Sequence, residues 1–398
     1  MEGDRLARQP QRSRRQPPRD APRRLVVRAR GGGDDGGRGA MDAGGLDHAP
    51  RQRGGHEGMD HLERPEPNRH FWRGKRVLVA GGTGFLGSHV TRALATAGAR
   101  VTIASRSGQG ALPRPEDVRS LRGDLRDPVF ASECTRGQDV VFHFASRIAG
   151  LAYNARHPAE MMTYNTVLDL QVLDAAARNA VPRCFYPSGA LVYDETAAVP
   201  VTEMAPTGGE PLAACQGAAW AKRAVEAAIR CYLAEFDMRV VVARLSNVYG
   251  PGDDFRPETA HLIANTIRRV ARGEPPDVVD DGTPIRSYLY VGDAVGAILR
   301  LAELAPTGPV NVGGRHEVSV RELVELIIEI SGTPLVPRLM AEGPRGLSRK
   351  LLDTTRLRTL TGFRESTSLR DGLTRTYEWY RQHAGLAPIS ADPAAPLR

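Results

Sequence analysis

The sequence predicts an α/β fold, in which a doubly wound parallel sheet is followed by a smaller C-terminal lobe. From Lys75 onward, short apolar runs rich in β-branched residues alternate with helical patterns, as in βαβ units. Gly81, Gly84 and Gly87 recur at every third position directly after the first of these runs. Beyond Tyr249 the segments are shorter and are interrupted by Pro and Gly, which indicates a separate lobe that closes over the sheet.

Residues 75–250 are expected to form the sheet and its covering helices. The predicted strands are 76–80, 100–104, 118–121, 140–145, 183–186 and 239–245, with helices at 88–97, 160–179 and 218–235. Because helices separate successive strands, we expect a parallel sheet. Residues 251–383 are expected to form mainly a substrate-binding lobe with helices at 261–271, 291–303, 319–330 and 368–382, and residues 384–398 a flexible tail.

Residues 1–70 are expected to be disordered, because they are rich in Arg, Gly, Pro and Asp and offer little apolar surface to bury. Most of the formal charge of +8 lies here: residues 1–58 hold 13 Arg against 8 Asp and Glu, a net +5, which leaves +3 for the rest. The segment is either an electrostatic arm for an acidic partner or a nonfunctional extension. We favour the extension, because Met41 and Met59 can each start a chain, and we do not expect nucleic-acid binding.

The remaining composition predicts a cytoplasmic protein without a metal. The four cysteines are far apart in the sequence and form no C-x-x-C pair, so neither a zinc site nor a disulfide framework is indicated. No apolar run reaches the length of about 18 residues that a membrane span requires, and the N-terminus lacks the apolar stretch of a secretory signal.

The glycine-rich loop is the strongest functional signal, because it follows a predicted strand and leads into a helix. In Rossmann-type folds the first glycine permits the tight turn, the second lets the backbone approach a pyrophosphate, and the third lets helix and strand pack closely. The alternative is a glycine-rich turn without a ligand. The loop predicts dinucleotide contacts from Gly81, Thr83, Gly84, Phe85, Leu86 and Gly87.

The choice of dinucleotide depends on the end of the second predicted strand. An acidic residue there would accept hydrogen bonds from the 2′-OH of the adenosine ribose, but this segment contains Ser105 and Arg106 and no carboxylate. A guanidinium suits a 2′-phosphate. We therefore favour NADP, with NAD as the alternative if Arg106 is only a solvated loop residue.

Several further motifs, in the same order along the chain, resemble those of the extended short-chain dehydrogenase/reductase family, the NAD(P)-dependent nucleotide-sugar epimerases and dehydratases. They are GDLRD at 123–127, VFHFA at 141–145, Asn165, VY at 192–193, NVYGPG at 247–252 and RSYLYVGD at 286–293. The resemblance implies that Asp124 and Leu125 lie along the adenine and Ala145 beside the cofactor. It also implies that Asn247 and Arg286 bind the substrate, with Arg286 on its diphosphate.

Within this family, residues 252–261 are most similar to the GDP-fucose synthases, with the GDP-mannose 3,5-epimerases as near relatives. That similarity implies a guanosine-linked sugar and an acid/base role for His261, beside a sugar ketone. An imidazole that titrates near neutral pH is suited to this role. Taken only as a residue, His261 at the start of a helix is equally well explained by packing or capping. The family resemblance also implies a homodimer.

The catalytic residues of the family, a Ser/Thr and a Tyr-x-x-x-Lys pair, are incomplete in this chain. Lys222 is in place, but Ala218 stands where the tyrosine belongs. Gly189 stands at the usual Ser/Thr position, with Ser188 one residue early, and the cysteine of the GDP-fucose synthases falls on Leu191. The candidate catalytic residues are therefore Lys222, His261 and Ser188. We expect Tyr186 and Tyr193 to pack rather than to replace the missing phenol.

The leading hypothesis from the sequence is an enzyme that epimerises or reduces a nucleoside-diphosphate sugar with NADP or NAD. Loss of a positioned acid or base lowers a rate by about 10²–10⁴, so another group must then transfer the proton. The competing hypothesis is a redox-silent protein that still binds the sugar nucleotide. A deliberate substitution at Ala218 is a third explanation, although Gly189 and Leu191 favour natural divergence.

Overall fold

The computed structural model describes residues 68–343 and 345–386. Its centre is a seven-stranded sheet with the order β10-β6-β5-β4-β1-β2-β3, in which every neighbouring pair is parallel. The strands are β1 (Arg76–Ala80), β2 (Arg100–Ser105), β3 (Arg119–Arg122), β4 (Val140–His143), β5 (Arg183–Gly189), β6 (Arg239–Leu245) and β10 (Val310–Val312). The predicted doubly wound parallel sheet is confirmed.

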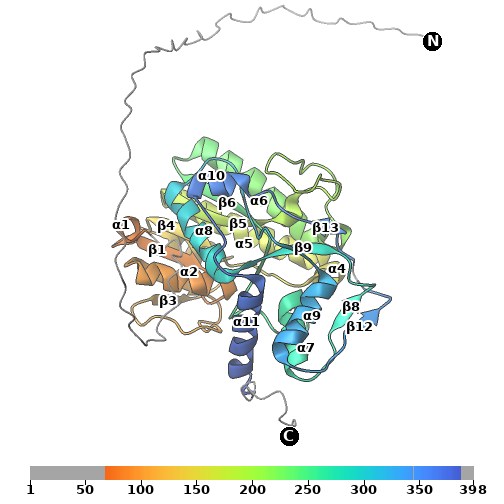
Figure 1. Cartoon of the computed structure of the whole chain (residues 1–398). Helices are drawn as coiled ribbons and strands as arrows, with labels where there is room; N and C mark the ends of the chain where they lie inside the picture. The colour runs from red at the N-terminus through yellow and green to blue at the C-terminus, as the bar shows by residue number, and fades with distance from the viewer. Residues whose placement is uncertain (1–67, 344, 387–398) are drawn as a thin grey trace, which may run out of the picture. The chain divides into compact units, whose positions relative to one another are not determined.

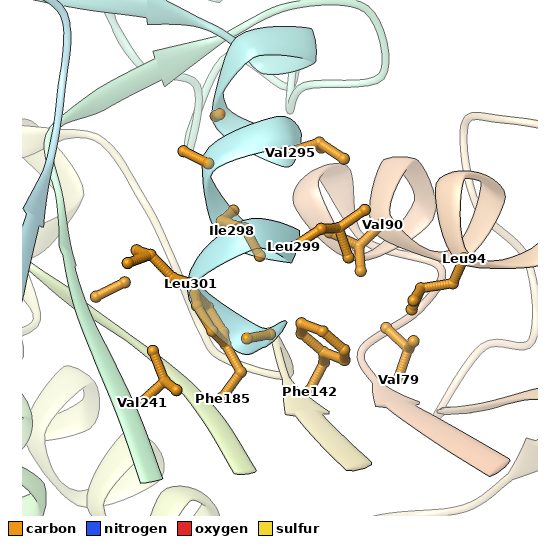
Figure 2. Packing of buried hydrophobic residues seen from close by; sticks show 14 of the residues in the cluster. Val79, Val90, Leu94, Phe142, Phe185, Val241, Val295, Ile298, Leu299 and Leu301 are labelled. Carbon is orange, nitrogen blue, oxygen red and sulfur yellow. The ribbon is translucent and has the colours of Figure 1, made fainter. Parts of the chain in front are cut away.

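Alternation along β1 supplies both faces of the sheet. Val77 and Val79 point into the first apolar core, and Leu78 and Ala80 point into the second. The first core is covered by α1 (Arg69–Trp72), α2 (Phe85–Thr96), α8 (Val291–Leu304) and α10 (Thr355–Thr361), and the second by α3 (Pro128–Thr135), α5 (Pro158–Arg178) and α6 (Gln216–Glu235). Figure 2 shows α8 and α2 packing on Val79 of β1, Phe142 of β4, Phe185 of β5 and Val241 of β6.

A second lobe has its own apolar core. Its helices are α7 (Leu262–Ala271), α9 (Val320–Ser331) and α11 (Leu369–His383), which pack together (Figure 1). Its strands form two small sheets: β7 (Asn247–Tyr249), β9 (Ile285–Tyr290), β11 (Glu317–Ser319) and β13 (Arg349–Lys350) in one, and β8 (Asp277–Val279) with β12 (Arg338–Met340) in the other. Short connecting helices are α4 (Leu151–Arg156), η1 (Ala190–Val192) and η2 (Ala213–Cys215).

The structure changes two of the predicted boundaries. Residues 251–383 do not all belong to the lobe, because α8 covers the main sheet and β10 extends it beside β6. The expected disorder of residues 1–70 is wrong for residues 68–70, since Asn68 caps α1 and Arg69 and His70 are helical. Residues 1–67 lie outside the described ranges, as do 387–398 of the predicted tail. No helix in the described ranges is long and apolar enough to cross a membrane.

Candidate functional site

The glycine loop is packed so closely that its first and third glycines have no room for a side chain. Gly81 has a φ of +78°, and a Cβ there would lie 2.4 Å from the backbone nitrogen of Ala145. A Cβ on Gly87 would lie 2.2 Å from the Gly81 carbonyl oxygen. Gly84 is the N-cap of α2 and makes no side-chain capping bond. Because these glycines carry no side chain, a pyrophosphate can approach the N–H groups at the N-terminus of α2 closely.

Replacing Gly87 by Val is expected to weaken dinucleotide binding more than about 100-fold, or about 2.8 kcal/mol. The added side chain would displace the Gly81 carbonyl and with it the whole loop. Fluorescence titration with NADPH measures the Kd. The control is Gly208→Ala, because a Cβ there meets nothing within 4 Å. Equal Kd values for Gly87→Val and wild type would contradict this assignment of the loop.

Tyr164 of α5 gathers three guanidinium groups at the carboxyl ends of β2, β3 and β4. The Cζ atoms of Arg106, Arg126 and Arg147 lie 5.5, 4.6 and 4.5 Å from its ring centroid. Arg147 also forms an ion pair with Glu160. Within residues 68–343 and 345–386, Arg106 forms no ion pair with a carboxylate. The positive charge of Arg106 is therefore available to a ligand, and the cation–π contact with the Tyr164 ring stabilises the guanidinium.

The neighbouring predicted adenosine ligands have definite partners. The Asp124 carboxylate pairs with Arg126 at 2.6 Å, and the hydrogen bond from this guanidinium lowers the pKa of Asp124. Leu125 is buried in the second core. The Ser105 hydroxyl accepts a hydrogen bond from the Gly108 backbone at 3.1 Å, which fixes the turn after β2.

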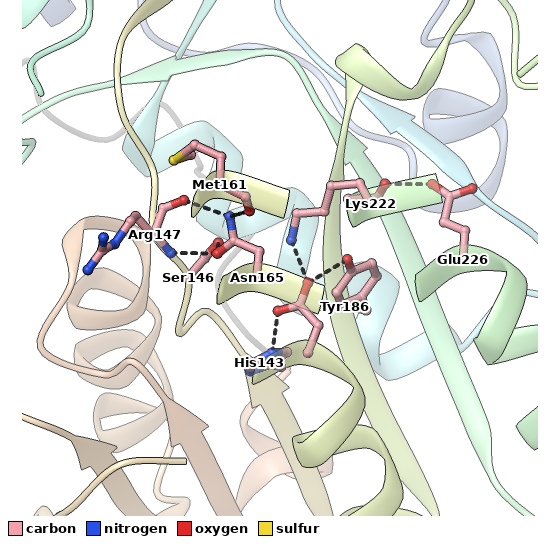
Figure 3. Close-up of polar contacts among 10 residues, drawn as sticks. His143, Ser146, Arg147, Met161, Asn165, Tyr186, Lys222 and Glu226 are labelled. Atoms are coloured by element: carbon pink, nitrogen blue, oxygen red, sulfur yellow. Dashed lines mark hydrogen bonds and ion pairs between the residues drawn. The ribbon is translucent and has the colours of Figure 1, made fainter. Parts of the chain in front are cut away.

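Lys222 belongs to a buried polar cluster built by four elements (Figure 3). Its Nζ lies 3.2 Å from Oδ2 of Asp169 on α5, and Tyr186 of β5 donates to the same oxygen at 2.8 Å. Nε2 of His143 on β4 lies 2.8 Å from Oδ1. Desolvation acts to raise the pKa of Asp169, but the Lys222 charge and the bonds from His143 and Tyr186 outweigh it and hold the pKa at about 2. Asp169 is therefore a carboxylate.

Ser188 lies in a different buried cluster. Its hydroxyl donates to Glu226 at 2.5 Å, and Glu226 pairs with Arg244 at 2.6 Å. Alternation along β5 puts Ser188 on the same face as Tyr186, under α6. This contact engages the hydroxyl in the interior, so we leave Ser188 out of the proposed catalytic set.

His261 is the N-cap of α7 and lies near the segment that follows β4. The residue as a whole is exposed at the surface, but neighbouring protein groups surround its ring. The resulting desolvation lowers the pKa of the imidazole. The Asp254 carboxylate and a hydrogen bond with the Ala149 backbone act in the opposite direction. The adjoining backbone is tied together as well, because the Gly150 N–H donates to the Thr259 carbonyl at 2.8 Å.

Arg286 and Lys350 are paired neighbours on β9 and β13. Both are partly buried, and burial lowers the pKa of each. Neither forms an ion pair within residues 68–343 and 345–386. A Cβ on Gly346 would lie 2.7 Å from the Arg286 guanidinium and 3.9 Å from Leu151, so α4 begins close to Arg286. Two desolvated cations without a carboxylate are suited to a diphosphate.

Asn247, the other predicted substrate ligand, also lies in the lobe. It lies on β7, and its amide nitrogen donates to the Ser287 carbonyl at 2.9 Å, which ties β7 to β9 beside Arg286. Within residues 68–343 and 345–386, no group of three or more His, Cys, Asp or Glu side chains is placed to hold a metal ion.

Sequence reasoning missed Asp169, Lys350 and Tyr164. Asp169 lies four residues after Asn165 on α5, so a carboxylate on the buried face of a predicted helix was the available signal. Lys350 had no comparable signal, because its relation to Arg286 depends on the pairing of a two-residue strand.

Comparisons with known proteins agree with this geometry. Residues 77–313 match the model of the NAD dependent epimerase/dehydratase family. The chain belongs to the NAD-dependent epimerase/dehydratase family. A dTDP-4-dehydro-6-deoxy-D-allose reductase of Streptomyces bikiniensis is 30% identical over 78% of this chain and 98% of the relative. A GDP-L-fucose synthase of Escherichia coli K12 is 30% identical over 78% of this chain and 97% of its own length.

Solved structures show the same family fold. A UDP-glucose 4-epimerase of Thermotoga maritima, crystallised with UDP-glucose, superimposes with a TM-score of 0.72. It is 26% identical, and the match covers 78% of this chain and 99% of that one. The family membership predicted from separated motifs, its enzyme class and the Rossmann-type fold are thereby confirmed.

Proposed function

We propose that this protein epimerises or reduces the sugar of a nucleoside diphosphate, with a guanosine-linked sugar as its substrate and NADP as its cofactor. The observation that carries the proposal is the half-buried pair Arg286 and Lys350, which lacks a carboxylate partner within the described ranges. The pair lies in the lobe beside α4, and the chain segment before α4 contacts His261. A diphosphate on these cations would extend its sugar toward the carboxyl edge of the main sheet.

The residues at the carboxyl edge of the main sheet fit a dinucleotide, and each has a separate role in the proposed reaction. A bound nicotinamide would supply or accept the hydride. The loop from Gly81 to Gly87 would hold the pyrophosphate, and Lys222 the nicotinamide ribose. His261 would remove or return a proton at a carbon beside the sugar ketone, with Asp254 supporting the imidazolium that forms. Asn247 stays a predicted substrate ligand.

A second candidate function is redox-silent binding of a sugar nucleotide. Two observations favour it: Ala218 carries no hydroxyl, and the Ser188 hydroxyl is engaged by Glu226. Such a protein would keep both binding surfaces and lack turnover.

Purified protein with a panel of GDP-, UDP- and dTDP-hexoses distinguishes the two functions. The proposed enzyme incorporates solvent deuterium beside the keto carbon or forms a new sugar, and does so fastest with a guanosine-linked substrate. Tight binding without deuterium or product would support the redox-silent function. Absence of both binding and turnover would overturn both.

The pH dependence of deuterium incorporation is expected to report His261. Desolvation lowers the pKa of this imidazole below its ordinary value, so the base stays neutral and active into mildly acidic solution. The acidic limb of the rate profile should therefore lie below about pH 6.5, the ordinary value for histidine. His261→Asn should remove this limb together with most of the rate. A limb that persists in His261→Asn would assign the proton transfer to another group.

Replacing Arg106 by Ala is expected to weaken NADP about tenfold or more while leaving NAD nearly unchanged. The guanidinium of Arg106, which lies over the Tyr164 ring, has no carboxylate partner in the part of the chain described here, and this supports a role in binding the 2′-phosphate. Parallel titrations with both dinucleotides measure the ratio. Arg100→Ala, at the opposite end of β2, is the control. An equal loss for NADP and NAD would contradict the role of Arg106 in selection.

We also propose that the protein is a cytoplasmic homodimer joined through α5 and α6. Met162 and Val167 on α5 and Leu233 on α6 are exposed, which supports an apolar contact at this helix pair. Sedimentation of wild type and of Met162→Glu tests the assembly.

A further inference from the structure

Asp169 of α5 differs from Glu226 of α6, the buried carboxylate of the neighbouring cluster. Glu226 forms an ion pair with Arg244, and the side chains of both residues are almost completely buried. This ion pair therefore lies in the interior of the protein. The Asp169 side chain is fully buried, whereas the Lys222 side chain keeps 13% of its surface exposed. The buried Asp169 carboxylate therefore holds the ammonium of Lys222, whose side chain extends toward the candidate site.

The environment of Lys222 leaves donors for a ligand. An ammonium has three N–H donors. Among the described residues, one of the three donors of Lys222 interacts with Asp169. The ammonium also lies 4.5 Å from the centroid of the Tyr186 ring. Ala218 lies one helical turn before Lys222 on α6 and offers it no polar contact. Asp169 is thus the anionic partner that fixes where the ammonium lies.

We propose that Asp169 is a positioning residue for cofactor binding, which holds the Lys222 ammonium where the nicotinamide ribose is bound. This inference rests on the proposed function only in requiring that the protein binds a dinucleotide. His143 and Tyr186 complete the cluster, since each donates to Asp169 and so keeps its carboxylate directed at Lys222. Among the described residues, Nδ1 of His143 has no hydrogen-bond partner, so His143 is anchored only through Nε2.

The test measures the Kd of NADPH by fluorescence, without any sugar. Asp169→Asn is expected to raise the Kd about tenfold or more, because the neutral amide no longer holds a charged donor. Glu226→Gln neutralises the buried carboxylate of α6 and is expected to leave the Kd nearly unchanged. Thermal unfolding of both variants shows whether they remain folded.

A double-mutant cycle separates positioning from general destabilisation. Lys222→Met alone should weaken binding, and adding Asp169→Asn to it should have no further effect, because the group that Asp169 positions is gone. Additive effects, or equal Kd values for Asp169→Asn and wild type, would overturn the proposal. If Asp169→Asn does not fold, Asp169→Glu replaces it in the same cycle, since it keeps the charge and shifts the carboxylate by one methylene.

The pH dependence of the Kd gives a readout that a merely structural role would not change. The groups around Lys222 are His143 on β4, Asp169 on α5, Tyr186 on β5 and Glu226 on α6. In Asp169→Asn, a partly buried ammonium would lack its counter-charge, which favours loss of its proton, so binding should weaken more steeply between about pH 7 and 10 than in wild type. Identical profiles would contradict the inference. A protein that binds NADPH but fails with every sugar nucleotide would overturn the proposed function and leave this test intact.

Discussion

Replacing Ala218 by Tyr is expected to raise kcat for hydride transfer by about 10²–10⁴-fold, the usual contribution of a positioned acid or base. Position 218 lies in the first turns of α6, four residues before Lys222, so both side chains project from the same face of the helix. Ala218 is partly exposed, which leaves room for a ring at the edge of the site. Absorbance of the reduced nicotinamide, followed with a keto-sugar nucleotide, measures the rate.

Ala218→Phe is the matched control, because it adds the same ring without the hydroxyl. The gain should require the hydroxyl and should also require Lys222, so Lys222→Met should cancel it. Equal rates for the Tyr and Phe variants would contradict the assignment of Ala218 to the proton-transfer position.

Replacing Glu226 by Ala is expected to lower the free energy of unfolding by about 3–5 kcal/mol, because it leaves a buried charge without its partner. The Arg244 side chain is 6% exposed and donates two hydrogen bonds to the Glu226 carboxylate, at 3.1 and 2.6 Å. Urea unfolding measures the loss. Ser188→Ala removes only one hydrogen bond and should cost about 1 kcal/mol, with the Kd of NADPH unchanged. A large loss of cofactor affinity in Ser188→Ala would return Ser188 to the site.

The strands at the centre of the main sheet were predictable because they are buried apolar runs, whereas the edge strand β3 has the sequence RSLR and no buried residue, and β10 was not predicted. The bounds 76–80 and 239–245 agree with β1 and β6, where four and five residues are fully buried. The lobe strands are two to six residues long and mix polar with apolar residues, so no local pattern indicated them, and their pairing defines them. Similarly, the position of α8 in the chain suggests the lobe, but its apolar surface packs on the main sheet.

The candidate site shows the same division between local and long-range features. The glycine loop is mainly a local feature, since its turn, its helix N-terminus and the approach of Gly87 to Gly81 lie within one short segment. The approach of Gly81 to Ala145 is the exception, because it depends on the packing of β1 beside β4. For Ser188, adjacency to Gly189 suggests a shared role, while strand alternation directs its side chain to Glu226. Asp169 joins Lys222 only through the packing of α5 on α6, and Lys350 joins Arg286 only through strand pairing.

A crystal structure of the protein with NADP and a GDP-hexose would show directly where both ligands bind. We expect the diphosphate on Arg286 and Lys350, the nicotinamide ribose on Lys222, and the sugar ring between the nicotinamide and His261. A sugar nucleotide bound away from Arg286 and Lys350, or a dinucleotide that does not contact the loop from Gly81 to Gly87, would contradict this expectation.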